Sequence, residues 1–216
     1  MLVNQIYNTV FSNDINTLII TKIPETINKR INNYVESKEK EIYNEWKTSF
    51  WNSIFNTIPD MNSGIYKSIF FDENTKLDSE LEYIKDCAYI LLKDYGFNIL
   101  KDQGMFHFDI FDMNTLNKIP TQYIVSTDNH ISDYNFSTCV FYTRKDIGVN
   151  GDFEYYENEP SMFTYKYMKK KVPTESCMAI LRNGELYYKI EDHCGYGKEY
   201  IISVHFKSES KHYKTV

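Results

Sequence analysis

Glycine and proline are scarce in this chain, with 8 glycines and 5 prolines among 216 residues. So few turn-forming residues exclude long flexible linkers between separate domains. A chain of this length can bury one substantial core. We therefore expect a single domain over residues 1–216, with a mainly helical support region containing short strands (1–96), a β core (97–207) and a short tail (208–216).

An excess of basic charge is also missing. The chain has 24 lysines and arginines against 30 aspartates and glutamates, which gives a formal net charge of -6. This balance provides no electrostatic footprint for nucleic acid or for acidic lipid. We interpret the one tight basic run, Lys169 to Lys171, as a solvated loop. The expectation is therefore no nucleic-acid partner and no membrane partner.

Targeting signals and cysteine pairs are absent as well. The apolar stretch from Leu18 to Ile23 is far too short to span a bilayer, and no charged-then-apolar leader precedes it. The four cysteines form no C-x-x-C pair. These absences predict a reduced, cytoplasmic protein. The bias toward Asn, Ile, Lys and Tyr suggests an AT-rich genome, such as that of a large DNA virus or a protist; for a virus, the location would be the host cytoplasm.

Two amphipathic helices are predicted in the first half of the chain. The first begins at Pro24-Glu25 and ends before Pro59, and its apolar stripe consists of Ile27, Ile31, Tyr34, Val35, Ile42, Trp46, Phe50 and Trp51. The second begins near Ser79, which forms a capping-box pattern with Glu82, and it stops at Gly96. Residues 68–71 (SIFF) predict a short strand, and residues 97–104 (FNILKDQG) predict a linker.

A β-turn-β pattern lies in the middle of the chain. Residues 138–143 (TCVFYT) and 152–156 (DFEYY) are rich in β-branched and aromatic residues, and the turn-forming segment 145–151 separates them. We interpret them as a hairpin. The sequence S-T-D-N precedes it, and residues spaced i, i+2 at a strand end point to the same side, as in a His-x-Asp metal clasp. Here that pair is Ser126 and Asp128.

With these elements the chain resembles the 2-oxoglutarate/Fe(II) oxygenases, and most closely their prolyl hydroxylase branch. The resemblance covers roughly residues 95–207 and implies an α+β fold, a double-stranded β-helix (jelly roll) braced by the N-terminal helices. Asp128 and Asn129 match the family's H-x-D-N motif, whereas Ser126 falls on its first iron ligand. Tyr142 matches a tyrosine that touches the cosubstrate.

The C-terminal strands extend the resemblance. Residues 177–181 (CMAIL), 186–192 (LYYKIED) and 200–206 (YIISVHF) follow the family's last strands. The family's distal histidine then falls on Tyr188, or on Tyr187 with a one-residue slip. The cation that binds 2-oxoglutarate falls on Glu199, or on Lys198 with the same slip.

These replacements are chemically unfavourable for iron and for the cosubstrate. Fe(II) in such enzymes is held by two imidazoles and one carboxylate. A serine hydroxyl is a poor substitute, and a tyrosine must first lose a proton from a group with an ordinary pKa of about 10. A glutamate at the cation position repels the distal carboxylate of 2-oxoglutarate.

A shifted iron site is one alternative, because Asp128 and His130 form an inverted D-x-H pair and His193 lies five residues after Tyr188. In the competing interpretation both histidines are ordinary loop or turn residues. A literal H-x-D at His107 to Asp109 lies inside an alternating apolar pattern, which predicts a strand interior.

Two functional hypotheses follow. The first is a non-catalytic pseudoenzyme that acts by binding another protein and holds no cofactor. The second is an active hydroxylase of a protein or small molecule that uses Fe(II) and 2-oxoglutarate. An unrelated jelly-roll binding module would share the strand pattern without requiring a metal.

Overall fold

The structure is a computed structural model, which describes residues 6–12, 17–45, 66–71, 76–113, 136–156, 169–183, 188–190 and 194–208. Its centre is a seven-stranded antiparallel sheet with the strand order β1-β2-β9-β5-β12-β4-β3. These strands are β1 (Ile6–Ser12), β2 (Thr17–Lys22), β9 (Met178–Asn183), β5 (Phe136–Lys145), β12 (Gly197–Ser208), β4 (Ile99–Met113) and β3 (Tyr66–Phe71). Strands from the N-terminal third thus lie at both edges, outside the β core predicted for residues 97–207.

Two smaller antiparallel sheets complete the β structure. One has the order β10-β7-β8, and the other pairs β11 with β6. Their strands are β10 (Tyr188–Ile190), β7 (Phe153–Tyr156), β8 (Lys169–Val172), β11 (Cys194–Gly195) and β6 (Val149–Asn150). The chain therefore leaves the large sheet after β5 and returns to it at β9 and β12, as a double-stranded β-helix requires.

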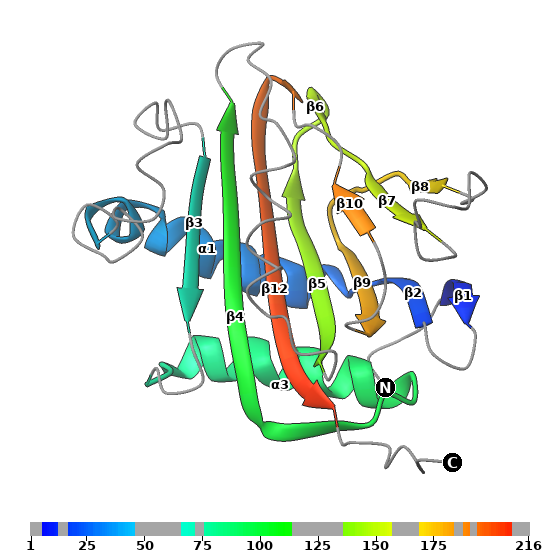
Figure 1. The fold of residues 1–216 in the computed structure, drawn as a ribbon. Coiled ribbons are helices and arrows are strands. Elements are labelled where there is room, and N and C mark those ends of the chain that lie inside the picture. Colours follow the sequence, from blue (N-terminus) through cyan, green and yellow to red (C-terminus); the bar gives the residue numbers. More distant parts are fainter. Residues whose placement is uncertain are drawn as a thin grey trace, which may run out of the picture.

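Both described helices, α1 (Glu25–Glu45) and α3 (Ser79–Asp94), cross behind the large sheet in Figure 1. Their apolar stripes join alternate strand residues in one core, which includes Ile31, Val35, Ile84, Leu91, Phe106, Phe108, Phe141, Leu181, Tyr200, Val204 and Phe206. The predicted α+β arrangement, with helices bracing one face, is confirmed. The predicted continuation of the first helix through Trp46, Phe50 and Trp51 lies outside the described residues. No helix in the described ranges is long and apolar enough to cross a membrane.

The start of α3 differs by one residue from the capping-box prediction. Asp78, not Ser79, is the N-cap, and its carboxylate accepts hydrogen bonds from the backbone of Glu80 and Leu81 at 3.0 and 2.9 Å. The other carboxylate oxygen accepts a 2.9 Å hydrogen bond from the Tyr34 hydroxyl on α1. Asp78 therefore caps one helix and joins it to the other. The predicted stop at Gly96 is confirmed, since its φ of +85° suits glycine.

The predicted hairpin between residues 138–143 and 152–156 is wrong. β5 pairs with β9 and β12, whereas β7 pairs with β10 and β8. The reason lies in burial, because residues 137–143 are all buried and such a run belongs in the centre of a sheet, where both edges of the strand are already paired. The two segments are strands, but they belong to different sheets.

Two further predictions are corrected, and two are confirmed. Most of the predicted linker is strand, since Ile99 to Gly104 form the first part of β4, and Ile99 is buried. The basic run Lys169 to Lys171 is not a loop but lies in β8. The predicted short strand at residues 68–71 is confirmed as part of β3, and the interpretation of His107 to Asp109 as a strand interior is confirmed by β4.

Candidate functional site

The predicted iron ligands lie almost entirely outside the described residues. This holds for Ser126, Asp128 and His130 with Asn129, and also for His193 and Tyr187. Tyr188 is the first residue of β10, where its backbone pairs with Tyr155 of β7. The predicted cosubstrate residues Tyr142, Lys198 and Glu199 are described, so the candidate site is built from them.

A β-bulge arranges the side chains around these residues. Tyr200 pairs with Arg144 and Ile201 pairs with Tyr142, so Thr143 is an extra residue on β5. Its carbonyl oxygen accepts a 2.9 Å hydrogen bond from the Asn28 side chain of α1. The extra residue reverses the alternation beyond it. Arg144 therefore turns toward the helices, and Lys145 turns toward the opposite face.

That opposite face holds a buried ion pair. Lys145 and Glu199 are directly opposite each other on β5 and β12, and Nζ of Lys145 lies 3.8 Å from Oε1 of Glu199. The Glu199 side chain is 0% exposed and that of Lys145 is 8% exposed. Asp152 Oδ1 also lies 3.8 Å from the ammonium group. Among the described residues, one cation thus faces two carboxylates.

Hydrogen bonds fix the lysine in this position. Its ammonium group donates to the carbonyl oxygen of Gly151 at 3.0 Å and to the hydroxyl of Thr174. Its backbone N–H donates to Ser176 Oγ at 2.7 Å. Lys145 therefore ties the end of β5 to the two segments that frame β7 and β8. Tyr142, on β5, is completely buried and is opposite Ile201.

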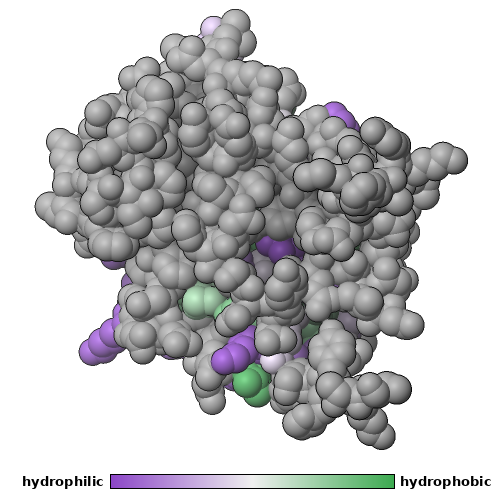
Figure 2. All heavy atoms as spheres, viewed as in Figure 1, coloured by the Kyte–Doolittle hydropathy of each residue, from purple (hydrophilic) through white to green (hydrophobic). Residues whose placement is uncertain are grey.

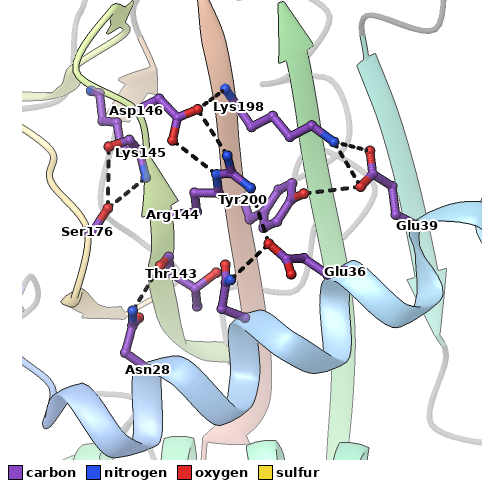
Figure 3. A network of polar contacts seen from close by, with 11 residues as sticks. Asn28, Glu36, Glu39, Thr143, Arg144, Lys145, Asp146, Ser176, Lys198 and Tyr200 are labelled. Atoms are coloured by element: carbon purple, nitrogen blue, oxygen red, sulfur yellow. Dashed lines mark hydrogen bonds and ion pairs between the residues drawn. The ribbon is translucent and has the colours of Figure 1, made fainter.

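Lys198 lies on the helix side of the sheet, as Figure 3 shows. Its ammonium group donates to both carboxylate oxygens of Glu39 on α1, at 3.0 and 3.1 Å. The Tyr200 hydroxyl donates to the same carboxylate at 3.1 Å. Burial, reinforced by the negative charge of Glu39, raises the pKa of Tyr200 to about 12. Of the two alternatives for the cation position, Lys198 therefore faces α1, and Glu199 faces away from it.

A second network on the helix side holds the turn after β5. Arg144 donates to both carboxylate oxygens of Asp146, at 3.0 and 3.2 Å, and to Glu36 on α1 at 3.1 Å (Figure 3). The hydrogen bond from Arg144 holds the pKa of Asp146 below its ordinary value. Asp146 also accepts a 2.9 Å hydrogen bond from the backbone N–H of Lys198. The ends of β5 and β12 are thus fixed to each other and to α1.

The donor set that the resemblance assigns to Fe(II) and 2-oxoglutarate is chemically unfavourable for both. In the described part of the chain, no group of three His, Cys, Asp or Glu side chains is arranged to hold a metal ion. The positions that the resemblance assigns to iron provide a hydroxyl, one carboxylate and a phenol. At Glu199, one of the two positions that the resemblance assigns to the cosubstrate's cation, the buried side chain is a carboxylate.

Sequence reasoning missed Lys145, which we interpreted as a turn residue. From Tyr142 to Lys145 is three positions, so simple alternation places the two side chains on opposite faces. Only the bulge at Thr143 brings Lys145 opposite Glu199. The one signal in the sequence is the short charged run Arg144 to Asp146 directly after an apolar strand, and it does not indicate which face each charge takes.

The fold is similar to that of a prolyl 4-hydroxylase from Pseudomonas putida, with a TM-score of 0.50 and 9% identity, over 89% of this chain and 93% of that one. A prolyl 4-hydroxylase from Phytophthora capsici has a TM-score of 0.49 and 9% identity, over 88% of this chain and 58% of that one. A viral collagen prolyl hydroxylase from Paramecium Bursaria Chlorella virus-1, in complex with 2OG, has a TM-score of 0.47 and 10% identity, over 93% of this chain and 99% of that one. No family model and no curated protein matches the sequence. At such identities the first likeness shows a shared fold and no more, and it confirms the predicted double-stranded β-helix.

Proposed function

We propose that this chain is an oxygenase-fold pseudoenzyme, which does not catalyse 2-oxoglutarate-dependent hydroxylation and acts by binding another protein. The observation that carries the proposal is the buried Glu199, paired with Lys145 at one of the two positions that the resemblance assigns to the cosubstrate's cation, the other being Lys198. A carboxylate repels a second carboxylate, and it does so more strongly where water is excluded.

Neither neighbouring lysine supplies the missing cation. Lys145 is already shared between the carboxylates of Glu199 and Asp152. Lys198 is held by Glu39 on the other face of the sheet. A ligand carboxylate entering this region would therefore face the Glu199 carboxylate, where an active oxygenase offers a bidentate cation.

Protein binding is supported by an exposed apolar tip, formed by Ile147 and Tyr196 on two neighbouring turns. Ile147 is fully exposed, at 107%, and Tyr196 is 55% exposed. The Tyr196 backbone N–H donates to the Gly148 carbonyl at 3.0 Å, and a Cβ atom at Gly148 would lie 2.5 Å from the Tyr196 carbonyl oxygen. A partner that covers exposed apolar side chains removes them from water, which stabilises the complex. Side chains that are already held in position lose less conformational freedom on binding.

Metal stoichiometry tests the proposal against the active-hydroxylase alternative. The purified protein is loaded anaerobically with Fe(II) or Mn(II), separated from free metal and analysed for bound metal. The proposal predicts far less than one metal ion per chain. Stoichiometric metal that is lost in His130→Ala or His193→Ala would contradict it and would support the shifted site.

A further inference from the structure

The edge strands of the described sheets differ in their protection against pairing with another chain. The edges are β1 and β3 in the large sheet, β10 and β8 in the three-stranded sheet, and both strands of the β11–β6 ribbon. Lysines lie in β3 (Lys67), in β10 (Lys189) and in β8 (Lys169 to Lys171). The strands of the ribbon have two residues each. Edge lysines and very short edge strands are two ways in which proteins prevent edge-to-edge association.

Strand β1 has neither form of protection. Its seven residues, IYNTVFS, include no charged residue and no proline, and most are β-branched or aromatic. Among the described strands, its hydrogen-bonded neighbour is β2 alone, and Figure 1 shows β1 at one end of the large sheet. β1 therefore provides a backbone edge that is long enough to pair with another strand and carries no charge against it.

The order of residues in β1 matches that of an identical strand running the opposite way. Antiparallel pairing centred on Thr9 places Thr9 opposite Thr9 of a second copy, and Tyr7 opposite Phe11 on either side. Aromatic pairs and Thr–Thr pairs are among those that stabilise antiparallel strands. The two register shifts between β1 and β2 also lie on either side of Thr9, so a two-fold axis through Thr9 relates one to the other. The net charge of -6 opposes association of two copies, but β1 adds no charge at the contact itself.

The described side chains on the face seen in Figure 2 offer less to a second copy. Their hydrophobic atoms reach the surface only in small areas, and hydrophilic atoms lie beside them. A stable contact between two faces needs a broader apolar area. An edge strand instead associates through its backbone, whose hydrogen bonds do not require an apolar surface.

We propose that β1 pairs with β1 of a second copy of this chain, antiparallel and about a two-fold axis through Thr9. The contact is isologous and joins two large sheets into one continuous sheet. A seven-residue edge buries less than about 800 Å² per partner, the size of a standard interface, so the dimer is weak and forms at high protein concentration. The inference does not depend on the proposed function, because it concerns neither Glu199 nor the apolar tip.

Sedimentation velocity of the full chain, from micromolar to millimolar concentration, tests the proposal. We expect the wild type to pass from monomer to dimer as the concentration rises. Thr9→Lys should weaken self-association roughly 10-fold or more, because two like charges then lie directly opposite each other. The matched control is Ser68→Lys, which makes the same change of charge on the other edge strand, β3, and should leave the dissociation constant unchanged.

A mixture of two charge variants tests the position of the axis. Thr9→Lys and Thr9→Glu should each remain monomeric when alone, and an equimolar mixture should recover dimers, because opposite charges then face each other. Ile147→Lys, on the apolar tip, should dimerise like the wild type. Self-association that is lost in Ile147→Lys and retained in Thr9→Lys would assign the contact to the tip and overturn the proposal.

Three further results would overturn it: a wild type that stays monomeric at every concentration, equal association of wild type and Thr9→Lys, or no recovery in the mixture. The first would leave the β1 edge to a strand of another protein. If Thr9→Lys does not fold, Thr9→Cys decides the question, since directly opposite residues of antiparallel strands lie within reach of a disulfide. Oxidised glutathione should then link two Thr9→Cys chains covalently and leave Ser68→Cys unlinked; equal linking of the two variants would contradict the pairing.

Discussion

Lys145 and Glu199 form a cross-strand ion pair in the interior of the protein, with Nζ and Oε1 3.8 Å apart and almost no exposed side-chain surface. Two charges in such surroundings depend on each other, because removing one takes a compensating charge away from the other. The loss of either charge should therefore destabilise the fold, in addition to changing the electrostatics of ligand binding.

Replacing Lys145 with methionine should destabilise the protein by about 3–5 kcal/mol, because Glu199 then loses its counter-ion. Urea unfolding measures this change. The double variant Lys145→Met/Glu199→Gln should recover a large part of the loss. Lys198→Met is the matched control, and since its partly exposed ion pair with Glu39 is more weakly stabilising, we expect a loss of about 1 kcal/mol or less. Equal losses in the two single variants would contradict a special role for Lys145.

Tyr200 should make the protein sensitive to alkaline pH. Its folded-state pKa of about 12 exceeds the ordinary value of 10.0, so the unfolded chain loses the proton first as pH rises. The stabilisation is fully present below pH 10 and is lost as pH approaches 12, with a total of about 2–3 kcal/mol. Unfolding curves of Tyr200→Phe across this window should fall less steeply than those of the wild type. Tyr196→Phe, an exposed tyrosine, serves as control and should follow the wild-type curve.

Asp78 should contribute more to stability than its neighbour Ser79. Asp78→Ala removes the N-cap of α3 and the acceptor for Tyr34, which together should cost about 1–2 kcal/mol. Ser79→Ala should change the free energy of unfolding by less than about 0.5 kcal/mol. The opposite order in chemical denaturation would support the capping box suggested by the sequence.

The iron site should be recoverable if the alignment with the hydroxylases is correct. Ser126→His combined with Tyr188→His would provide two imidazoles beside Asp128, the donor set that Fe(II) prefers. We expect the double variant to bind about one Mn(II) per chain under conditions where the wild type binds far less. Absence of metal from the folded double variant would count against the assigned positions of the ligands.

Local patterns in the sequence predicted both described helices and the strands β3, β4, β5 and β7, and the family resemblance predicted β9, β10 and β12. The stripe with Ile27, Ile31 and Val35 marks the buried face of α1, and the alternation of Phe106, Phe108 and Ile110 marks the side of β4 that faces the helices. Such patterns depend on neighbouring residues only. They do not determine which strands pair, so the hairpin prediction for residues 138–156 was wrong even though both strands exist.

The chemistry of the site was less accessible from the sequence than the fold. The resemblance drew attention to Glu199, but a single extra residue at Thr143 decides that Lys145 is its counter-ion. The place of β1 at one edge of the large sheet depends in the same way on strand order, which joins segments that are far apart in the sequence. Both features depend on long-range strand pairing, which periodicity does not encode.

Calorimetric titration of 2-oxoglutarate in the presence of Mn(II) tests the central claim most directly. The claim is that the Lys145–Glu199 pair prevents a dicarboxylate from binding beside it, on the face of the large sheet opposite the helices. We predict no saturable heat for the wild type or for Lys198→Arg, which changes a side chain on the helix face. We predict measurable binding for Glu199→Arg, which replaces a carboxylate of the cluster with a cation. Saturable binding of 2-oxoglutarate by the wild-type protein that is abolished in Lys145→Met would contradict the account.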